Sequence, residues 1–248
     1  LLMNIGQNLS KKELGLLKRI KKRNVGNPTT VKVNNIEVDF DYFQSLKEFL
    51  FLKEKIKKKI FNIIEIGAGY GRTCHAFLSL NNDLKKYLII DFPEMLSLSS
   101  RYLKRVLDNK NFKKVSFIDA NQNLDNITEL NLKNCLTINI NSFNEMSDDA
   151  FSIYIELINE IGGFFYTKNP VAKFNDPEIT TNIKRKRIAL NTGQIKKIIN
   201  IFNEKELNKA KRNYVQTYLP STKWKIISTK FSRPLIYYLQ TLYEKKNN

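Results

Sequence analysis

The chain has 248 residues, 42 % of them hydrophobic, which suits one α/β domain with an extension or two small domains. No apolar run approaches the roughly 20 residues of a membrane-spanning helix, and we expect no signal peptide. Two cysteines with one histidine argue against a zinc site. The net charge of +18 would suit an anionic partner, although the richness in Lys, Asn and Ile is equally typical of an AT-rich genome.

Residues 1–59 are expected to form a helical extension that acts as a lid, binds the acceptor or packs against the edge of a sheet. Residues 1–24 have helical spacing, and residues 40–59 return to it. Between them, apolar residues alternate over 31–38 around an Asn34-Asn35 turn, which predicts a small hairpin.

From residue 60 the pattern changes to short apolar runs that alternate with helical segments. This rhythm predicts βαβ units and a Rossmann-like α/β fold, with a mostly parallel central sheet and helices on both faces. Ligands bind at the carboxyl ends of the strands in such sheets. Strands are expected at 61–66, 87–90, 115–118, 135–140, 163–167 and 224–229, and helices at 72–80, 94–107 and 148–161.

A basic insert is expected at about 170–215, before the last strands of the domain that spans 60–248. It contains the basic run Lys184–Arg187 and a Lys-rich stretch with helical spacing over 194–213. The run would suit an anionic acceptor, and a solvated loop is the plainer interpretation.

A glycine-rich turn joins the first strand of this domain to its first helix, within the segment IIEIGAGYG over 63–71. Glycines permit a tight turn and let a ligand approach the backbone, and the helix that follows offers its N-terminal amides to a negative group. A dinucleotide fingerprint would place a third glycine at position 72, where Arg72 stands. The ligand contacts predicted from this turn are those of Glu65, Gly67, Ala68, Gly69, Tyr70 and Gly71.

Acidic residues end the next two predicted strands. Asp91 lies 20 residues after Gly71, where a carboxylate can accept hydrogen bonds from both ribose hydroxyls of a nucleoside. Asp119 ends the third strand and is followed by Ala120. A helix cap is the alternative role of Asp91, and a plain loop position that of Asp119.

The order acidic-x-G-x-G-x-G resembles motif I of the class I S-adenosylmethionine (SAM)-dependent methyltransferases. The resemblance implies that the glycine turn holds the methionine part of SAM, that Asp119 and Ala120 lie near the adenine, and that S-adenosyl-L-homocysteine is the product. The remaining cofactor contacts are expected from Phe92, Asn139 and Asn141.

Four longer stretches together resemble the bacterial family of sugar O-methyltransferases. This resemblance covers roughly residues 25–235 and implies methyl transfer to a sugar hydroxyl, on a nucleotide sugar or a precursor of a surface glycan or capsular polysaccharide. The stretches are IEIGAGYGRTCHAFL (64–78), YLIIDFP (87–93), ININSFNEM (138–146) and GGFFYTKNP (162–170).

A sugar hydroxyl is a poor nucleophile, so a general base is expected within hydrogen-bond reach of it. The candidates are Glu145, His75 and Tyr166. Each also has a structural alternative: a helix cap or ion pair for Glu145, a buried histidine with satisfied hydrogen bonds for His75, and a core or pocket-wall position for Tyr166. No metal is expected, because few carboxylates follow the fourth strand. The acceptor contacts are expected from Ser142, Lys168 and Asn169.

Other functions stay open at this point. The acceptor oxygen could belong to a phosphate or phosphoramidate-type substituent, the protein could be an RNA 2′-O-methyltransferase, or it could bind SAM without catalysis. The Asn-Ile-Asn-Ser-Phe segment after the fourth strand lacks the prolines typical of base-amino methyltransferases, so nucleic acid is the less favoured acceptor. Cys74 and Cys135 are expected to be reduced in a cytoplasmic protein, and the oligomeric state, including a homodimer, is left open.

Overall fold

The computed structural model describes residues 1–248 except 123, 131, 175–189 and 247–248. The described chain forms two compact units, Leu1–Gln122 (unit 1) and Asn123–Asn248 (unit 2). None of the described helices is long and apolar enough to cross a membrane. The boundary expected at residue 59 marks where the α/β pattern starts, and as a functional division it stays a prediction.

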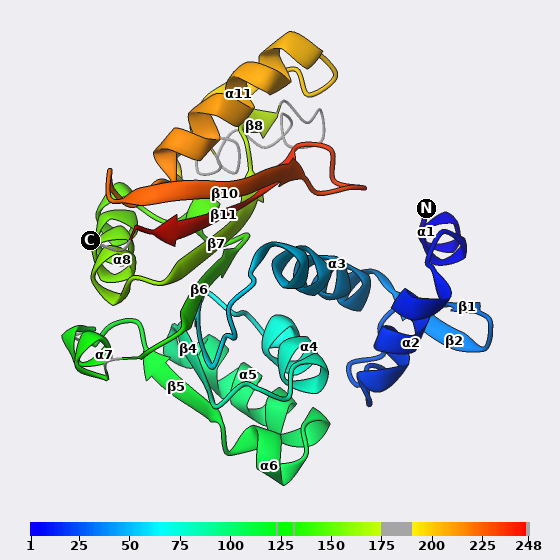
Figure 1. The fold of residues 1–248 in the computed structure, drawn as a ribbon. Coiled ribbons are helices and arrows are strands. Elements are labelled where there is room, and N and C mark those ends of the chain that lie inside the picture. The colour runs from blue at the N-terminus through cyan, green and yellow to red at the C-terminus, as the bar shows by residue number, and fades with distance from the viewer. Residues whose placement is uncertain (123, 131, 175–189, 247–248) are drawn as a thin grey trace. The chain divides into compact units, whose positions relative to one another are not determined.

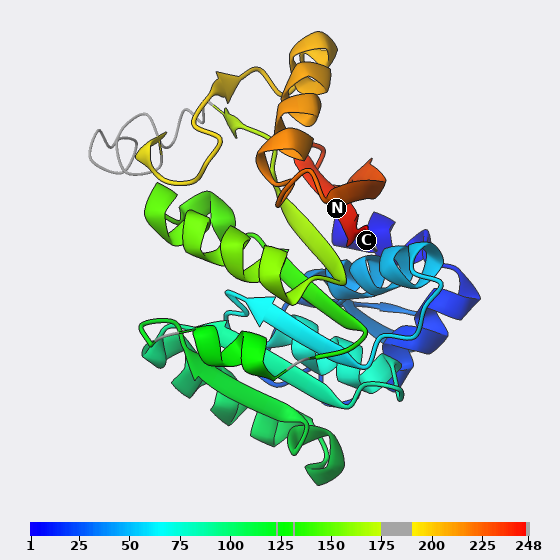
Figure 2. The same ribbon diagram turned by 60° about the vertical axis from the view of Figure 1, so that its left-hand side comes forward.

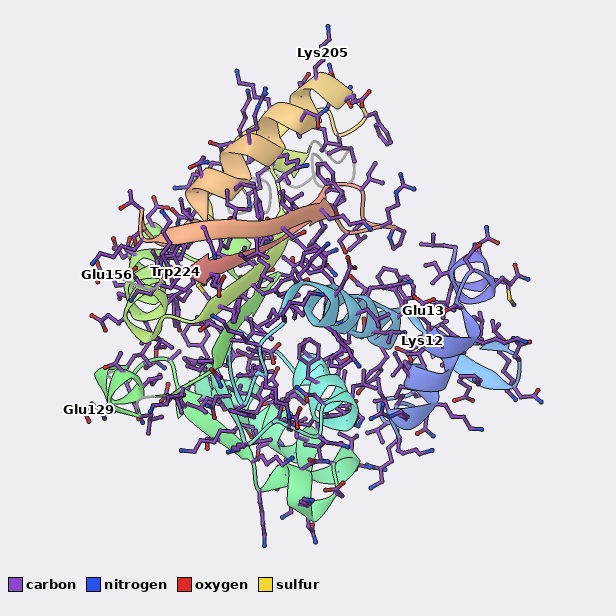
Figure 3. The ribbon with its side chains drawn as sticks, viewed as in Figure 1. Lys12, Glu13, Glu129, Glu156, Lys205 and Trp224 are labelled. Atoms are coloured by element: carbon purple, nitrogen blue, oxygen red, sulfur yellow. The ribbon has the colours of Figure 1, made fainter. Side chains whose placement is uncertain are left out.

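The first elements of unit 1 are α1 (Leu2–Gln7), α2 (Lys11–Arg19), β1 (Thr30–Val33), β2 (Ile36–Asp39) and α3 (Phe40–Lys55). A capping box starts α2: the Ser10 hydroxyl accepts the N–H of Glu13, and the Glu13 carboxylate, labelled in Figure 3, accepts the N–H of Ser10. β1 and β2 form the predicted hairpin, with positive φ at Asn34 and Asn35. Arg23, which follows α2, pairs with Asp39 of β2 at 2.8 Å and so links this segment to the hairpin.

Three parallel strands form the sheet of unit 1 (Figure 1). Their side chains are largely buried apolar residues, as expected for parallel strands. Helices connect these strands, as parallel strands require, and α5 packs on β4 and β5. The elements are β3 (Asn62–Ile66), α4 (Arg72–Leu80), β4 (Lys86–Asp91), α5 (Pro93–Val106), α6 (Asn109–Phe112) and β5 (Val115–Asp119).

Unit 2 contains a parallel strand pair and an antiparallel one. β6 and β7 run parallel, whereas β11 runs antiparallel to both β7 and β10, and α11 lies beside β11 (Figures 1 and 2). The elements are α7 (Asp125–Glu129), β6 (Cys135–Ile140), the 3-10 turn η1 (Phe143–Glu145), α8 (Asp148–Ile161), β7 (Phe164–Pro170), β8 (Lys173–Phe174), β9 (Ile198–Ile199), α11 (Glu204–Thr217), β10 (Trp224–Phe231) and β11 (Tyr238–Lys245).

The central sheet has the strand order β10-β11-β7-β6-β3-β4-β5. Helices alternate with its strands along the chain, and the predicted α/β, Rossmann-like class is confirmed. The sheet is mostly parallel, and its antiparallel part is confined to the last strands.

The structure corrects the prediction for the insert. The Lys-rich stretch over 194–213 is not one helix: β9 occupies 198–199, and α11 begins at Glu204, where the Asn203 side chain accepts two backbone N–H groups. β7 also continues to Pro170, beyond the predicted end of this strand at 167. The basic run Lys184–Arg187 lies outside the described residues.

Candidate functional site

The glycine turn of unit 1 has the backbone geometry that its sequence predicts. Gly67, Gly69 and Gly71 have φ of 72°, 58° and 94°, a region that side-chain-bearing residues rarely adopt. The Gly67 N–H donates to the Ile90 carbonyl at 2.9 Å, which fixes the turn to β4. A Cβ on Gly71 would lie 3.0 Å from Leu103, whereas one on Gly69 would meet no described atom within 4 Å. Packing therefore explains Gly71, and the open side of Gly69 suits an approaching ligand.

Asp91 lies at the carboxyl end of β4 and bonds directly to this turn. Its Oδ2 accepts the Gly69 N–H at 3.0 Å, and its Oδ1 accepts the Phe92 N–H at 2.9 Å. Burial raises the pKa of Asp91, and backbone N–H groups partly oppose that rise. The next side chain, Phe92, is 58 % exposed, so an apolar face stands beside the carboxylate.

The end of β5 lies level with the end of β4. Asp119 is the register partner of Asp91, and the Ala120 N–H donates to the Asp91 carbonyl at 2.9 Å. The Asp119 carboxylate accepts the Asn121 N–H at 2.8 Å, which turns the chain away from the strand. The structure thus brings the glycine turn and both predicted acidic residues to one edge of the unit 1 sheet.

Glu65 faces the interior of unit 1 and is 2 % exposed. Its carboxylate accepts hydrogen bonds from the Tyr87 hydroxyl at 2.7 Å and from Thr73 on α4. Burial raises the pKa of Glu65 to about 7, against the opposing effect of these two hydrogen bonds. This arrangement anchors the first turn of α4 beneath the glycine turn, and direct contact of Glu65 with a cofactor stays a prediction.

His75 is also buried, and it belongs to a polar aromatic cluster that sequence reasoning missed. Its Nδ1 pairs with the Tyr42 hydroxyl of α3, which also pairs with the Tyr102 hydroxyl of α5. The Tyr42 and His75 rings pack edge to face with centroids 5.4 Å apart. Burial, assisted by Arg23 and Lys22, lowers the pKa of His75 to about 4. His75 is therefore neutral near pH 7 and is held in place by two helices.

The N-terminal end of α3 contacts the glycine turn through polar groups. The Tyr70 hydroxyl donates to the Asp41 carboxylate at 2.8 Å, and Arg72 donates to the Asp41 carbonyl at 2.7 Å. Arg72 also lies 3.7 Å from the buried carboxylate of Glu48. These contacts hold α3 against the turn, so the predicted extension is tied to the predicted cofactor site within unit 1.

The carboxyl ends of β6 and β7 in unit 2 carry a buried amide network. The Asn169 amide donates to the side chains of Asn139 at 2.9 Å and Thr167 at 2.8 Å, and its backbone N–H donates to the Tyr214 hydroxyl at 2.9 Å. Ser142 accepts from the Asn139 amide. The Asn169 Oδ1 is buried without a hydrogen-bond partner among the described residues, so it can still accept a donor.

Two predicted residues of β7 are deeply buried, as the core alternative anticipated for Tyr166 but not for Lys168. Tyr166 is fully buried, and its hydroxyl donates to Gln240 of β11 at 3.0 Å. Lys168 is 2 % exposed, so it is not the solvated lysine that its type suggests. Tyr166 lies in the middle of the strand and Lys168 near its end.

Glu145 is exposed and shares its surroundings with two residues that the sequence did not single out, Lys173 and Tyr238. The Tyr238 hydroxyl donates to the Asn141 side chain at 2.7 Å, and Lys173 donates to the Asn144 carbonyl at 3.2 Å. Burial lowers the pKa of Lys173 while the charge of Glu145 raises it. Burial raises the pKa of Tyr238 to about 12, with smaller effects from Tyr237 and Glu145. The group combines a carboxylate, an ammonium and a phenol.

Metal ligands do not gather in the described part of the chain. No group of three His, Cys, Asp or Glu side chains is close enough there to hold an ion. Metal independence itself stays a prediction.

Comparisons with solved structures identify the fold. The methyltransferase domain of bacterial CtHen1-C matches with a TM-score of 0.55 at 10 % identity, over 82 % of this chain and 97 % of that one. Methanococcus jannaschii fibrillarin, a pre-rRNA processing protein, matches with 0.52 at 10 % identity, over 92 % and 86 %. The glycopeptide N-methyltransferase MtfA, complexed with SAM, matches with 0.50 at 10 % identity, over 82 % and 94 %. No family model and no curated protein matches the sequence. The chain has the Rossmann-like fold of these solved structures.

Proposed function

We propose that the protein is a SAM-dependent methyltransferase whose cofactor binds at the carboxyl edge of β3, β4 and β5. The observation that carries this proposal is the open side of Gly69 beside Asp91, since that backbone has room for a ligand that a side chain would displace. The fold supports the proposal, because two of the three similar solved structures named above are described as methyltransferases.

The proposed cofactor contacts follow from the chemistry of each group. The amides at the start of α4 suit the methionine carboxylate, and the free acceptor capacity of Asp91 suits the ribose hydroxyls. Phe92 offers an exposed ring face for the adenine, and Asp119 with Ala120 would border it. SAM supplies a methyl group on a sulfonium. The cofactor contacts expected from Asn139 and Asn141 stay predictions.

The acceptor is proposed to be a hydroxyl of a sugar, and this substrate class rests on the sequence resemblance. Glu145 is the proposed general base, since it is exposed and can take a proton from a hydroxyl that attacks the methyl group. Asn169 is the proposed orienting group, because its Oδ1 can accept a hydrogen bond from another hydroxyl. Ser142 and Lys168 are proposed to assist it. His75 and Tyr166 are buried and paired, so positioning roles are proposed for them.

Methyl transfer from labelled SAM to a panel of nucleotide sugars and glycans tests this proposal. Glu145→Gln is expected to lower kcat at least about 100-fold while SAM affinity stays unchanged. Glu156→Gln is the matched control, because Glu156 is an exposed carboxylate on α8 (labelled in Figure 3). Equal activity of the two variants would remove Glu145 from the mechanism, and SAM binding without transfer to any acceptor would favour a non-catalytic role.

One observation favours a second acceptor class, an oxygen of a phosphate or phosphoramidate-type substituent. Lys173 is a half-buried cation whose Nζ bonds to a backbone carbonyl, and Glu145 is near it. Lys173 would stabilise a bound anion there, against the repulsion of the Glu145 carboxylate. In the same assay, Lys173→Gln would raise KM for phosphorylated acceptors at least about tenfold and leave KM for neutral sugars unchanged, whereas an equal effect on both would exclude anion recognition.

A further inference from the structure

Basic side chains gather at the amino edge of the unit 1 sheet, opposite the glycine turn. Short loops lead into β3, β4 and β5, and the strands start level with one another, since Asn62 pairs with Lys86, and Tyr87 with Val115. The lysines of these loops therefore lie along one edge. They are Lys57, Lys58 and Lys59 before β3, Lys85 and Lys86 at β4, and Lys113 and Lys114 before β5.

Helix ends add further basic residues to this edge. Short connections join α3 to β3 and join α5, through α6, to β5, so the carboxyl ends of these helices lie near the amino ends of the strands that follow them. The last turn of α3 carries Lys53 and Lys55, that of α5 carries Lys104 and Arg105, and α6 carries Lys110. We call these residues, together with the seven loop lysines, the basic edge. Its acidic residues are Glu54, Asp83 and Asp108.

The opposite edge of the same unit has the other sign. Asp91, Glu94 and Asp119 lie at the carboxyl ends of β4 and β5, where Arg72 is already engaged by Asp41 and Glu48. Lysine-rich composition alone would spread positive charge over both edges. The two edges of the unit 1 sheet instead differ in sign, and an extended anionic surface would attract the amino edge.

We propose that the basic edge docks on the anionic surface of a lipid bilayer. Ten of its twelve basic side chains, all but Lys55 and Lys114, are exposed, and they come from successive loops along one sheet edge, which suits a broad surface. None of the exposed large apolar side chains belongs to the described loops and helix ends of this edge. The binding is therefore electrostatic and reversible, without an inserted anchor.

The local chemistry favours a bilayer over nucleic acid. Proteins hold nucleic-acid phosphates by close contacts from arginine and lysine side chains, backbone N–H groups and helix N-termini. The basic edge has a single arginine, Arg105, and presents helix carboxyl ends, whose carbonyls disfavour close contact with any individual phosphate. Lysines in such places act as diffuse charges, which is how polybasic segments bind anionic leaflets. Docking by this edge turns the glycine turn of unit 1 away from the bilayer.

Co-sedimentation with vesicles tests the proposal. The full chain is mixed with vesicles of phosphatidylcholine alone or with phosphatidylglycerol added, at low and physiological salt. The test variant neutralises Lys57, Lys58, Lys86, Lys104 and Lys113 to Gln. The matched control neutralises five exposed lysines elsewhere: Lys11, Lys12, Lys32, Lys205 and Lys209 (Lys12 and Lys205 are labelled in Figure 3). Each lysine near an anionic surface contributes roughly fivefold to partitioning.

The wild type is expected to bind only the vesicles that contain phosphatidylglycerol, and salt should weaken the binding. The test variant should lose at least about 30-fold in partitioning, against less than about threefold for the control, with the circular dichroism spectrum of both unchanged. Equal losses would show that only net charge matters and would overturn the proposal. Tighter binding of the wild type to duplex DNA or RNA than to vesicles at the same salt would also overturn it.

Discussion

Glu65→Gln should change the pH dependence of stability in a direction that the structure fixes. The carboxyl is buried, and its pKa is raised from 4.5 to about 7. The folded state therefore holds a proton that the unfolded state releases, and the stability from this proton is complete below the unfolded pKa and lost as pH rises through the folded pKa. A pKa rise of this size contributes about 3 kcal/mol to the free energy of unfolding, and this contribution is lost between about pH 4.5 and 8.

Glutamine is nearly isosteric and can still accept the hydrogen bond from Tyr87, but it does not ionise. Urea unfolding of both proteins at about pH 5 and about pH 8 gives the relevant free energies. The stability of Glu65→Gln relative to wild type should increase by about 3 kcal/mol from the lower to the higher pH. A constant difference across this range would refute the buried, proton-holding carboxyl.

Three further changes test other parts of the structure. His75→Asn should remove a pH effect opposite in sign to that of Glu65. The pKa of His75 is lowered to about 4, so the wild type loses stability as pH drops from 6.5 towards 4. Over this range the stability of the variant relative to wild type should rise by about 3 kcal/mol in urea unfolding. Gly69→Ala should cost about 1–2 kcal/mol from its φ of 58°, yet weaken SAM binding at least about tenfold in calorimetry. Tyr214→Phe should destabilise the protein by about 1–3 kcal/mol in thermal unfolding, since the Asn169 N–H loses its acceptor; no change would mean that this amide finds another.

Most of the fold could be predicted because its strands are short, continuous apolar runs that end at turn residues. β6 and α8 have the predicted bounds, and so does α4 after the glycine turn. β11 has no such run, because the polar Gln240 and Thr241 are buried between neighbouring strands. Periodicity cannot reveal that kind of burial, since it depends on partners far away in the chain.

β11 was a strand that the pattern did not predict, whereas in the insert the pattern predicted a helix where the structure has a strand. Ile195, Ile198 and Ile199 have helical spacing, yet β9 takes up two of them by pairing with β8. A short apolar pattern does not distinguish a helix from a strand, and the pairing partner decides the outcome.

The candidate site divides in the same way. The glycine turn, Asp91 and Asp119 could be predicted, since each follows a strand at a fixed place in a βα unit. The partners of His75 could not, because Tyr42 and Tyr102 come from helices 33 residues before it and 27 residues after it. Lys173 and Tyr238 likewise reach the surroundings of Glu145 from distant segments, and no local pattern marks them.

Calorimetric titration with SAM tests the central claim most directly. Wild type and Asp83→Ala, a matched control at the opposite edge of the unit 1 sheet, should bind SAM with micromolar affinity, and Asp91→Ala should lose at least about 100-fold. Circular dichroism confirms that each variant is folded. No binding by the wild type, or equal binding by all three proteins, would contradict a SAM site built on the glycine turn and Asp91.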